Sequence, residues 1–321
     1  MPRIYDCFLY NDERELLAIR LQLLAHIVHT FVIVWSSETF TGLKKRNPFP
    51  RDLLNLPGLK GKIKLIELGA LGAMGAWNKE AFSRNSLGQG IADAESSDLI
   101  MVSDVDEIPR PSSLAELVGR DHQDNLVVLG QDYFNFKFNY QLVHGLQAVW
   151  PGPVLCRFQV FKSAQELRDK RWILLEDPNT CLEDAGWHFS FLTATAEVSN
   201  KLASFSHQEE RIQSRRENIE SLVATRQGFH DHMHPGSVWA VVPLNALRCA
   251  SLERLTASFP QFVISANADD RDALDRAIRH SVRRMRDYER SKIAGWYRWG
   301  ELLAEMFVRL KRRLLRAFHK K

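Results

Sequence analysis

Two aspartates separated by one residue, Asp104 and Asp106, follow the apolar run 99–102 almost directly. A short apolar run that ends in turn residues is typical of a strand buried on both faces. In an extended chain, residues two apart project from the same face, and two such carboxylates repel each other unless a cation or a proton lies between them. Mg²⁺ and Mn²⁺ prefer oxygen ligands of this kind. The pattern predicts a metal site, and the alternative is an acidic turn in which Asp106 caps a helix.

A second group of ionisable residues lies further along the chain. Glu183 and Asp184 precede His188, which stands between two aromatic residues. A histidine in such surroundings is usually a core residue, but the nearby carboxylates make His188 a candidate for metal ligation or acid–base chemistry. His207 is the alternative histidine. The alternating histidines within 230–234 stand beside proline and glycine, which favours a surface loop over a metal site.

Apolar runs alternate with helical spacing before Asp104, and this alternation predicts how the aspartates are positioned. The predicted elements are strands at 4–9, 31–34, 63–68 and 99–102, the last with Ser103 and Asp104 at its carboxyl end, and helices at 16–27 and 76–94. This order predicts an α/β fold with a Rossmann-type, mostly parallel sheet flanked by helices. Open sheets of this type bind ligands at the carboxyl ends of their strands, where the aspartates are expected.

The character of the sequence changes after residue 110. We predict a short helix at 112–118 and strands at 126–129 and 154–161. Aromatic residues crowd the segment between these two strands, interleaved with amides and a histidine: Tyr133, Phe134, Phe136, Phe138, Tyr140 and Trp150. Such a cluster is most often core, and it also suits a groove in which sugar rings stack on aromatic faces.

Positive charge is concentrated at the end of the chain. The formal net charge is +4, but seven Lys and Arg and no acid lie in 309–321, which leaves 36 basic and 39 acidic residues elsewhere. A nearly neutral body argues against a nucleic-acid-binding surface. No apolar run is long enough to span a membrane, and the first residues lack the apolar core of a secretory signal. Because four scattered cysteines indicate reduced thiols, we expect a cytoplasmic protein.

Residues 266–321 form a predicted helical tail. A charged helix is expected over 269–291, and from Trp296 onward apolar residues recur at spacings of three and four opposite a basic face. Basic amphipathic helices bind anionic membrane surfaces, so 296–321 predicts a peripheral location on the inner face of the plasma membrane. The alternative is that this apolar face packs on the protein body or on a second subunit of a homo-oligomer.

Four stretches together resemble glycosyltransferase family 17: IYDCFLYNDERELLAIRL (4–21), FVIVWSSETFTG (31–42), SDLIMVSDVDEIP (97–109) and AGWHFSF (185–191). The resemblance implies a GT-A-like domain over 1–265, ahead of the tail. Residues 1–110 would form its nucleotide-sugar half and 111–265 its acceptor half. It also implies metal-dependent, inverting transfer of a sugar from a UDP-sugar donor, UDP-GlcNAc in this family, to a glycan or lipid-linked glycan acceptor.

The resemblance also implies roles for the candidate residues. Asp104 and Asp106 are expected to bind the Mn²⁺ or Mg²⁺ ion and the diphosphate, with Asp106 as the more direct metal ligand. His188 is the expected third metal ligand. Asp184 is the first choice for the base that takes the proton of the acceptor hydroxyl, and Glu183 is the second.

Asp6, Arg84 and Asn85 are further candidates for nucleotide binding, since a planar guanidinium suits phosphate oxygens. For Arg84 the alternative is an ion pair on a helix surface. Two other functions are weighed against glycosyl transfer. A nucleotidyltransferase would need a glycine-rich, basic loop after the first strand, which residues 11–14 match poorly. A sugar-binding protein without catalysis would be expected to lack a carboxylate of the acidic motif, yet both aspartates are present.

Overall fold

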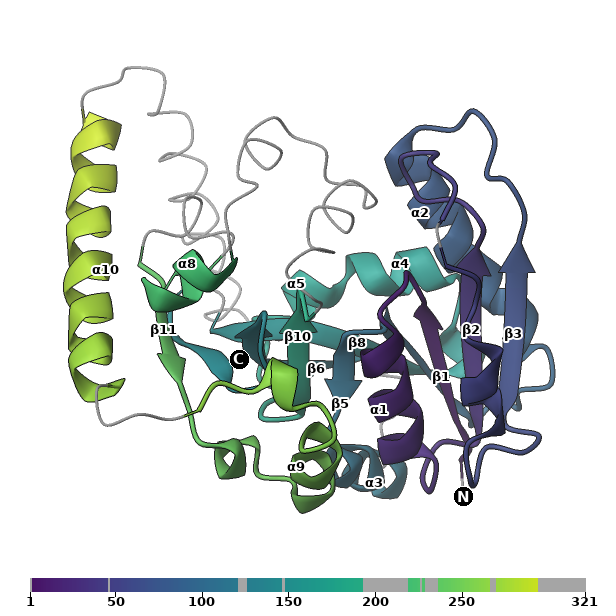
Figure 1. The fold of residues 1–321 in the computed structure, drawn as a ribbon. Coiled ribbons are helices and arrows are strands. Elements are labelled where there is room, and N and C mark those ends of the chain that lie inside the picture. Colours follow the sequence, from purple (N-terminus) through teal and green to yellow (C-terminus); the bar gives the residue numbers. More distant parts are fainter. Residues whose placement is uncertain are drawn as a thin grey trace, which may run out of the picture.

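A computed structural model describes residues 2–45, 47–120, 126–145, 148–192, 219–225, 227–228, 236–265 and 270–293. The strands are β1 Ile4–Leu9, β2 Thr30–Ser36, β3 Ile63–Leu68, β4 Leu99–Asp104, β5 Glu107–Pro109, β6 Val127–Asn135, β7 Tyr140–His144, β8 Val149–Arg157, β9 Cys181–Leu182, β10 Gly186–Ser190 and β11 Val238–Val241. The α-helices are α1 Arg14–Leu24, α2 Ala76–Asn85, α3 Pro111–Gly119, α4 Ala164–Asp169, α5 Arg171–Leu175, α8 Ile219–Ala224, α9 Ala250–Thr256 and α10 Asp270–Ile293. All the strands belong to one curled sheet with helices on both faces (Figure 1).

Four strands form a parallel ladder in the order β3-β2-β1-β4. The chain builds this ladder from β1 outward to β3 and then crosses back, so that β4 lies on the other side of β1. As a result the carboxyl ends of β1 and β4 lie together, with Leu9 opposite Asp104. Open α/β sheets bind ligands where the strand order reverses in this way. The predicted α/β fold is confirmed, and so is the parallel arrangement of its first half.

The second half of the sheet is mixed. β8 lies antiparallel to β4, β6 lies antiparallel to β8, and β10 lies parallel to β6. The prediction of a mostly parallel sheet is therefore wrong beyond β4. Parallel neighbours are usually joined by a crossover helix, whereas only the short strand β7 lies between β6 and β8 in the chain.

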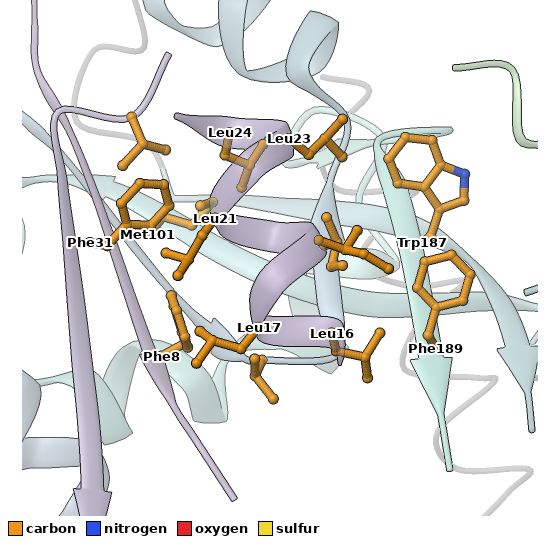
Figure 2. Packing of buried hydrophobic residues seen from close by; sticks show 14 of the residues in the cluster. Phe8, Leu16, Leu17, Leu21, Leu23, Leu24, Phe31, Met101, Trp187 and Phe189 are labelled. Carbon is orange, nitrogen blue, oxygen red and sulfur yellow. The ribbon is translucent and has the colours of Figure 1, made fainter. Parts of the chain in front are cut away.

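Helix α1 packs across the junction between the two halves of the sheet. Figure 2 shows its leucines against side chains of β1, β4 and β10, among them Phe8, Met101, Trp187 and Phe189. All of them belong to one buried cluster that runs from β1 to residues of the second half. Each buried Leu or Phe side chain contributes about 1.5–3 kcal/mol. This shared core fixes β10 relative to the end of β4.

The aromatic-rich segment is mainly core. Phe134, Phe136, Phe138 and Tyr140 are each at most 1% exposed. Trp150 is only partly buried, and it lies at the site described below. The interpretation of the segment as a sugar-binding groove therefore does not apply to these four residues.

The predicted helix 76–94 ends early. α2 stops at Asn85, and the 3-10 helix Ser86–Ile91 follows it. Gly90 lies so close to β2 that a Cβ there would stand 2.2 Å from a methyl carbon of Val32. This approach requires a glycine, and glycines disfavour a continuous α-helix.

The charged helix expected over 269–291 is present as α10. It contacts β11 and buries Ala277 and Ser281, which are 2% and 5% exposed. The amphipathic segment 296–321, His207 and the histidines of 230–234 lie outside the described residues. Among the helices that the structure describes, none combines the length and the apolar character needed to cross a membrane.

Candidate active site

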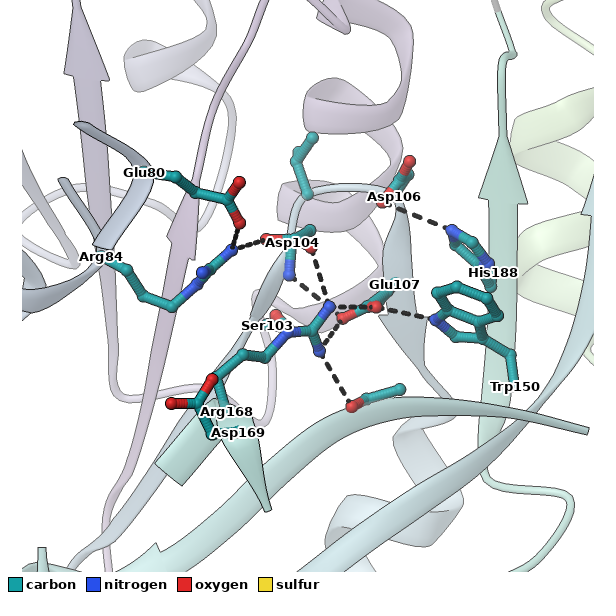
Figure 3. A network of polar contacts seen from close by, with 12 residues as sticks. Glu80, Arg84, Ser103, Asp104, Asp106, Glu107, Trp150, Arg168, Asp169 and His188 are labelled. Carbon is teal, nitrogen blue, oxygen red and sulfur yellow. Dashed lines mark hydrogen bonds and ion pairs between the residues drawn. The ribbon is translucent and has the colours of Figure 1, made fainter. Parts of the chain in front are cut away.

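The acidic motif forms a tight turn between two strands. β4 ends at Asp104, and β5 begins at Glu107 after the two intervening residues. β5 then runs antiparallel to β10, with Glu107 opposite His188. The N–H of Phe189 donates to the carbonyl oxygen of Asp106 at 2.9 Å. The turn therefore brings Asp106 beside His188 (Figure 3).

A buried arginine holds this turn from inside the core. Arg20 donates to the backbone oxygens of Asp104 and Glu107, at 2.9 Å each, and to Ser103 Oγ at 2.7 Å. Both carboxylate oxygens of Asp6 accept from Arg20, at 2.9 and 2.6 Å, and neither side chain is exposed. This corrects the prediction that Asp6 binds the nucleotide, because its charge is matched inside the core. Asp6 instead supports the arginine that shapes the turn.

Asp104 lies between two arginines. Its Oδ1 accepts from Arg84 at 3.1 Å and its Oδ2 from Arg168 at 2.7 Å. Burial raises the pKa of Asp104, but the nearby guanidinium groups, Arg168 foremost, outweigh burial and hold the pKa well below its ordinary value. Asp104 is therefore ionised at neutral pH, and its charge is matched within the protein.

Glu107 is the most deeply buried acid of the motif, at 1% exposure. Arg168 donates to both of its oxygens, at 2.5 and 2.7 Å. Trp150 Nε1 and the N–H of Asp104 donate to it at 2.8 and 3.1 Å. Although burial lowers the pKa of Arg168, the charges of Asp104 and Glu107 raise it above its ordinary value. Arg168 therefore remains the permanent counter-ion of two carboxylates.

Asp106 and His188 face each other at the turn. His188 Nε2 lies 3.8 Å from Asp106 Oδ1, and the two side chains are 7% and 13% exposed. The imidazole stacks between Tyr133 and Trp150, with ring centroids 4.8 and 4.3 Å away. Among the described residues, Nδ1 of His188 has no hydrogen-bond partner. The stacking fixes the plane of the ring and directs Nε2 toward Asp106 (Figure 3).

These side chains fit a divalent ion as a pair of ligands and not as a triad. An imidazole nitrogen and a carboxylate oxygen 3.8 Å apart can both reach one ion at bond lengths of roughly 2.0–2.2 Å. Each oxygen of Asp104 accepts one hydrogen bond from an arginine, and its role as a further metal ligand stays a prediction. Within the part of the chain that the structure describes, no three His, Cys, Asp or Glu side chains converge as metal ligands. An ion held by Asp106 and His188 would take its other ligands from water and substrate phosphate.

The predicted base lies at the other end of β10. Asp184 Oδ1 accepts from Arg110 at 2.8 Å and from Arg248 at 2.5 Å, and Arg248 also reaches Asp132 at 3.2 Å. Asp184 lies in a turn with a φ of 52° and precedes β10 by two residues, whereas His188 is the third residue of that strand. The structure therefore places Asp184 with Arg110 and Arg248 and not beside Asp106.

Glu183, the second choice of base, is exposed beside Asp184 and lies at the same end of β10. Gly186 helps to explain this placement. β10 approaches β5 so closely there that a Cβ would lie 2.3 Å from the carbonyl oxygen of Ile108. The pairing of β10 with β5 thus places His188 at the acidic turn, whereas Glu183 and Asp184 lie before the start of β10.

The remaining nucleotide candidates lie on α2, next to Asp104. Arg84 is 3% exposed and donates to Glu80 and Gln165, at 2.8 Å each, as well as to Asp104. Asn85 Oδ1 accepts from the backbone N–H of Gln165 at 3.0 Å. Both residues fasten α2 to α4, so Arg84 is neither a surface ion pair nor open toward solvent.

With this geometry in place, the chain can be compared with known proteins. The sequence model of glycosyltransferase family 17 matches residues 1–228. The chain belongs to glycosyltransferase family 17. Membership assigns it a role in glycosyl transfer, which implies a nucleotide-sugar donor and a glycan acceptor. No curated protein matches this family 17 chain.

Two solved structures share part of the arrangement of this family 17 chain at 12% identity. A crystal structure of S. aureus TarS, residues 1–349, aligns with 88% of this chain and 80% of its own length, with a TM-score of 0.34. A crystal structure of 4-diphosphocytidyl-2C-methyl-D-erythritol synthase aligns with 53% of this chain and 85% of its own, with a TM-score of 0.30.

Sequence reasoning selected Arg84 but neither Arg20 nor Arg168 of this family 17 site. For Arg20 a signal existed, because a charged residue inside an apolar helix pattern and Asp6 inside an apolar strand each require a buried partner. For Arg168 none existed, since Glu107 lies 61 positions away in the chain. Only the folded chain shows which acid each arginine meets.

Proposed function

We propose that this chain transfers a sugar, GlcNAc in the first instance, from a UDP-linked donor to a hydroxyl group of a glycan or lipid-linked glycan, with inversion. Family membership supports a nucleotide-sugar donor, and the choice of UDP and GlcNAc follows from the resemblance of the motifs. The observation that carries the proposal is the meeting of Asp106 with His188, at 3.8 Å, beside the point where the strand order reverses.

In this proposal Asp106 and His188 hold a Mg²⁺ or Mn²⁺ ion. A bound ion of this kind neutralises charge that develops on a leaving diphosphate. Asp104 and Glu107 hold Arg84 and Arg168 in place, so the turn is already organised before the donor binds. Such organisation lowers the barrier because little reorganisation remains for the reaction itself.

The test is an assay of UDP release from a panel of UDP-sugars, with and without a glycan acceptor. We expect turnover with Mg²⁺ or Mn²⁺ and none after chelation. Asp106→Asn and His188→Gln should each reduce turnover about 100- to 1,000-fold, because each removes a group that acts on developing charge.

Asp275→Asn and His280→Gln are the matched controls, since both residues are exposed on α10, away from the acidic turn. Both control variants should retain full turnover. Full turnover in the chelated protein would exclude the ion from the mechanism, and full turnover in Asp106→Asn would exclude the proposed site. Release of pyrophosphate from a nucleoside triphosphate instead would indicate a nucleotidyltransferase.

A further inference from the structure

One arginine side chain beside the acidic turn differs from its neighbours in having no acceptor among the residues that the structure describes. Arg84 and Arg168 both donate to carboxylates. The side chain of Arg171, the first residue of α5, makes no hydrogen bond or ion pair to any described residue. Its guanidinium carbon lies 5.8 Å from the ring centres of both Trp150 and Trp172. The two indole rings therefore hold the side chain while its five N–H donors have no acceptor in that part of the chain.

The surroundings of Arg171 are those of an anion site. Burial first, and then the positive charge of Arg168, lower the pKa of Arg171 to about 10, although Glu107 and Asp104 act in the opposite direction. At neutral pH the group is thus still charged, although it is partly removed from water and repelled by its neighbour. An anion bound to the Arg171 guanidinium would offset both the loss of hydration and the repulsion by Arg168. The attraction would be strong because the site is partly desolvated.

The position of Arg171 indicates which anion this is. Trp150 contacts Arg171 on one side, and it stacks on His188 at 4.3 Å and donates to Glu107 at 2.8 Å. Helix α5 contacts β6 and β8 next to β10 (Figure 1). Arg171 therefore borders the same site as the Asp106–His188 pair, where the proposed function places the donor.

We propose that Arg171 binds the diphosphate of the nucleotide-sugar donor, beside Trp150. The inference rests on the proposed function for the identity of the donor. Both terminal NH2 groups of Arg84 already donate within the protein, to Glu80, Gln165 and Asp104. A planar guanidinium presents two parallel N–H groups to one phosphate, and the ammonium group of lysine lacks this planar geometry.

The test is calorimetric titration of the full chain, in the presence of Mg²⁺, with UDP, uridine and inorganic pyrophosphate. Arg171→Gln should bind UDP about 10- to 100-fold more weakly than the wild type, which is the loss expected for a charged hydrogen-bonded pair. Arg171→Lys should fall between them. Uridine binding should be the same in all three proteins. Arg254→Gln, on the exposed face of α9, is the matched control and should bind like the wild type.

Melting temperatures show whether a variant has lost its fold, and Arg171→Lys gives a second measurement should Arg171→Gln unfold. Equal UDP affinity in the wild type and a folded Arg171 variant would overturn the inference and leave the proposed function standing. Arg171-dependent binding of pyrophosphate without binding of UDP would uphold the anion site and overturn the UDP donor. Binding of neither ligand by the wild type would overturn both.

Discussion

A cluster of acids and arginines lies near each end of β10, and the two clusters differ in how their acidic side chains are paired. The Asp104 cluster consists of Asp104, Asp106, Glu107, Arg84, Arg168 and His188. The Asp184 cluster consists of Asp184, Asp132, Arg110 and Arg248. In the Asp104 cluster the arginines donate hydrogen bonds to Asp104 and Glu107, whereas Asp106 and His188 face each other. In the Asp184 cluster both arginines donate to the same oxygen of Asp184.

The difference shows that residue types alone do not distinguish a candidate functional site from a cluster of ion pairs that only stabilises the fold. Arg110 is 7% exposed, lies over the Trp187 ring at 4.4 Å and donates to the carbonyl oxygen of Leu247 at 2.8 Å. Asp184 therefore helps to fasten the segment before α9 to β10. The Asp104 cluster lies instead at the carboxyl ends of the parallel strands β1 and β4, the edge at which open α/β sheets bind ligands.

The comparison depends most on Arg20, because this residue shapes the turn of the Asp104 cluster. Arg20→Ala leaves Asp6 buried and unpaired and removes the donor to three backbone oxygens, so we expect a loss of about 3–5 kcal/mol in the free energy of unfolding. Urea unfolding followed by circular dichroism measures this loss. Arg254→Ala, at an exposed position, should change stability by less than about 0.5 kcal/mol. A loss below about 1 kcal/mol for Arg20→Ala would mean that the turn does not depend on it.

Asp184→Asn tests the other cluster. Asp184 and Arg248 are 48% and 55% exposed, and exposed ion pairs contribute little, so we expect a loss of about 0.2–1 kcal/mol in the free energy of unfolding. Turnover of a UDP-sugar should stay within about twofold of the wild type, whereas Asp106→Asn should lose nearly all of it. A loss of turnover in Asp184→Asn as large as that in Asp106→Asn would restore Asp184 as the base.

The smallest expected effect is an opposite response of the two clusters to pH. The pKa of Asp104 lies below its ordinary value of 3.8, so its stabilising contribution is present above that pH and is lost as the pH falls toward the lowered pKa. Burial raises the pKa of Asp132 despite Arg248, and Asp184 adds to the rise. Its contribution therefore favours folding at low pH and is lost as the pH rises from 3.8 through the raised pKa.

Urea unfolding between about pH 3 and 6 measures both responses. In Asp104→Asn the free energy of unfolding should fall less steeply than in the wild type as the pH is lowered. In Asp132→Asn the small fall in the free energy of unfolding that the wild type shows as the pH rises should be absent. The same sign in both variants would show that the two clusters do not differ in this respect.

The strands of the first half could be predicted from the sequence, as could the place of the acidic motif. β1 was predicted with the correct bounds, 4–9, because a mainly apolar run suits a strand buried on both faces, and β3 was predicted with the correct bounds, 63–68. The partners of Asp6, Asp104 and Glu107 could not be predicted, because these contacts join residues up to 87 positions apart. The antiparallel second half was also missed, since a local pattern does not show how a strand pairs.

By itself the sequence determined that two aspartates two residues apart end a buried strand, because spacing and an apolar run are local properties. It also determined that a histidine between aromatic residues follows, with two carboxylates and a glycine before it. Only the tertiary structure decided that this histidine, and not Asp184, meets the acidic turn. The pairing of β5 with β10 brings His188 to Asp106, whereas Asp184 precedes β10 and is held by Arg110 and Arg248.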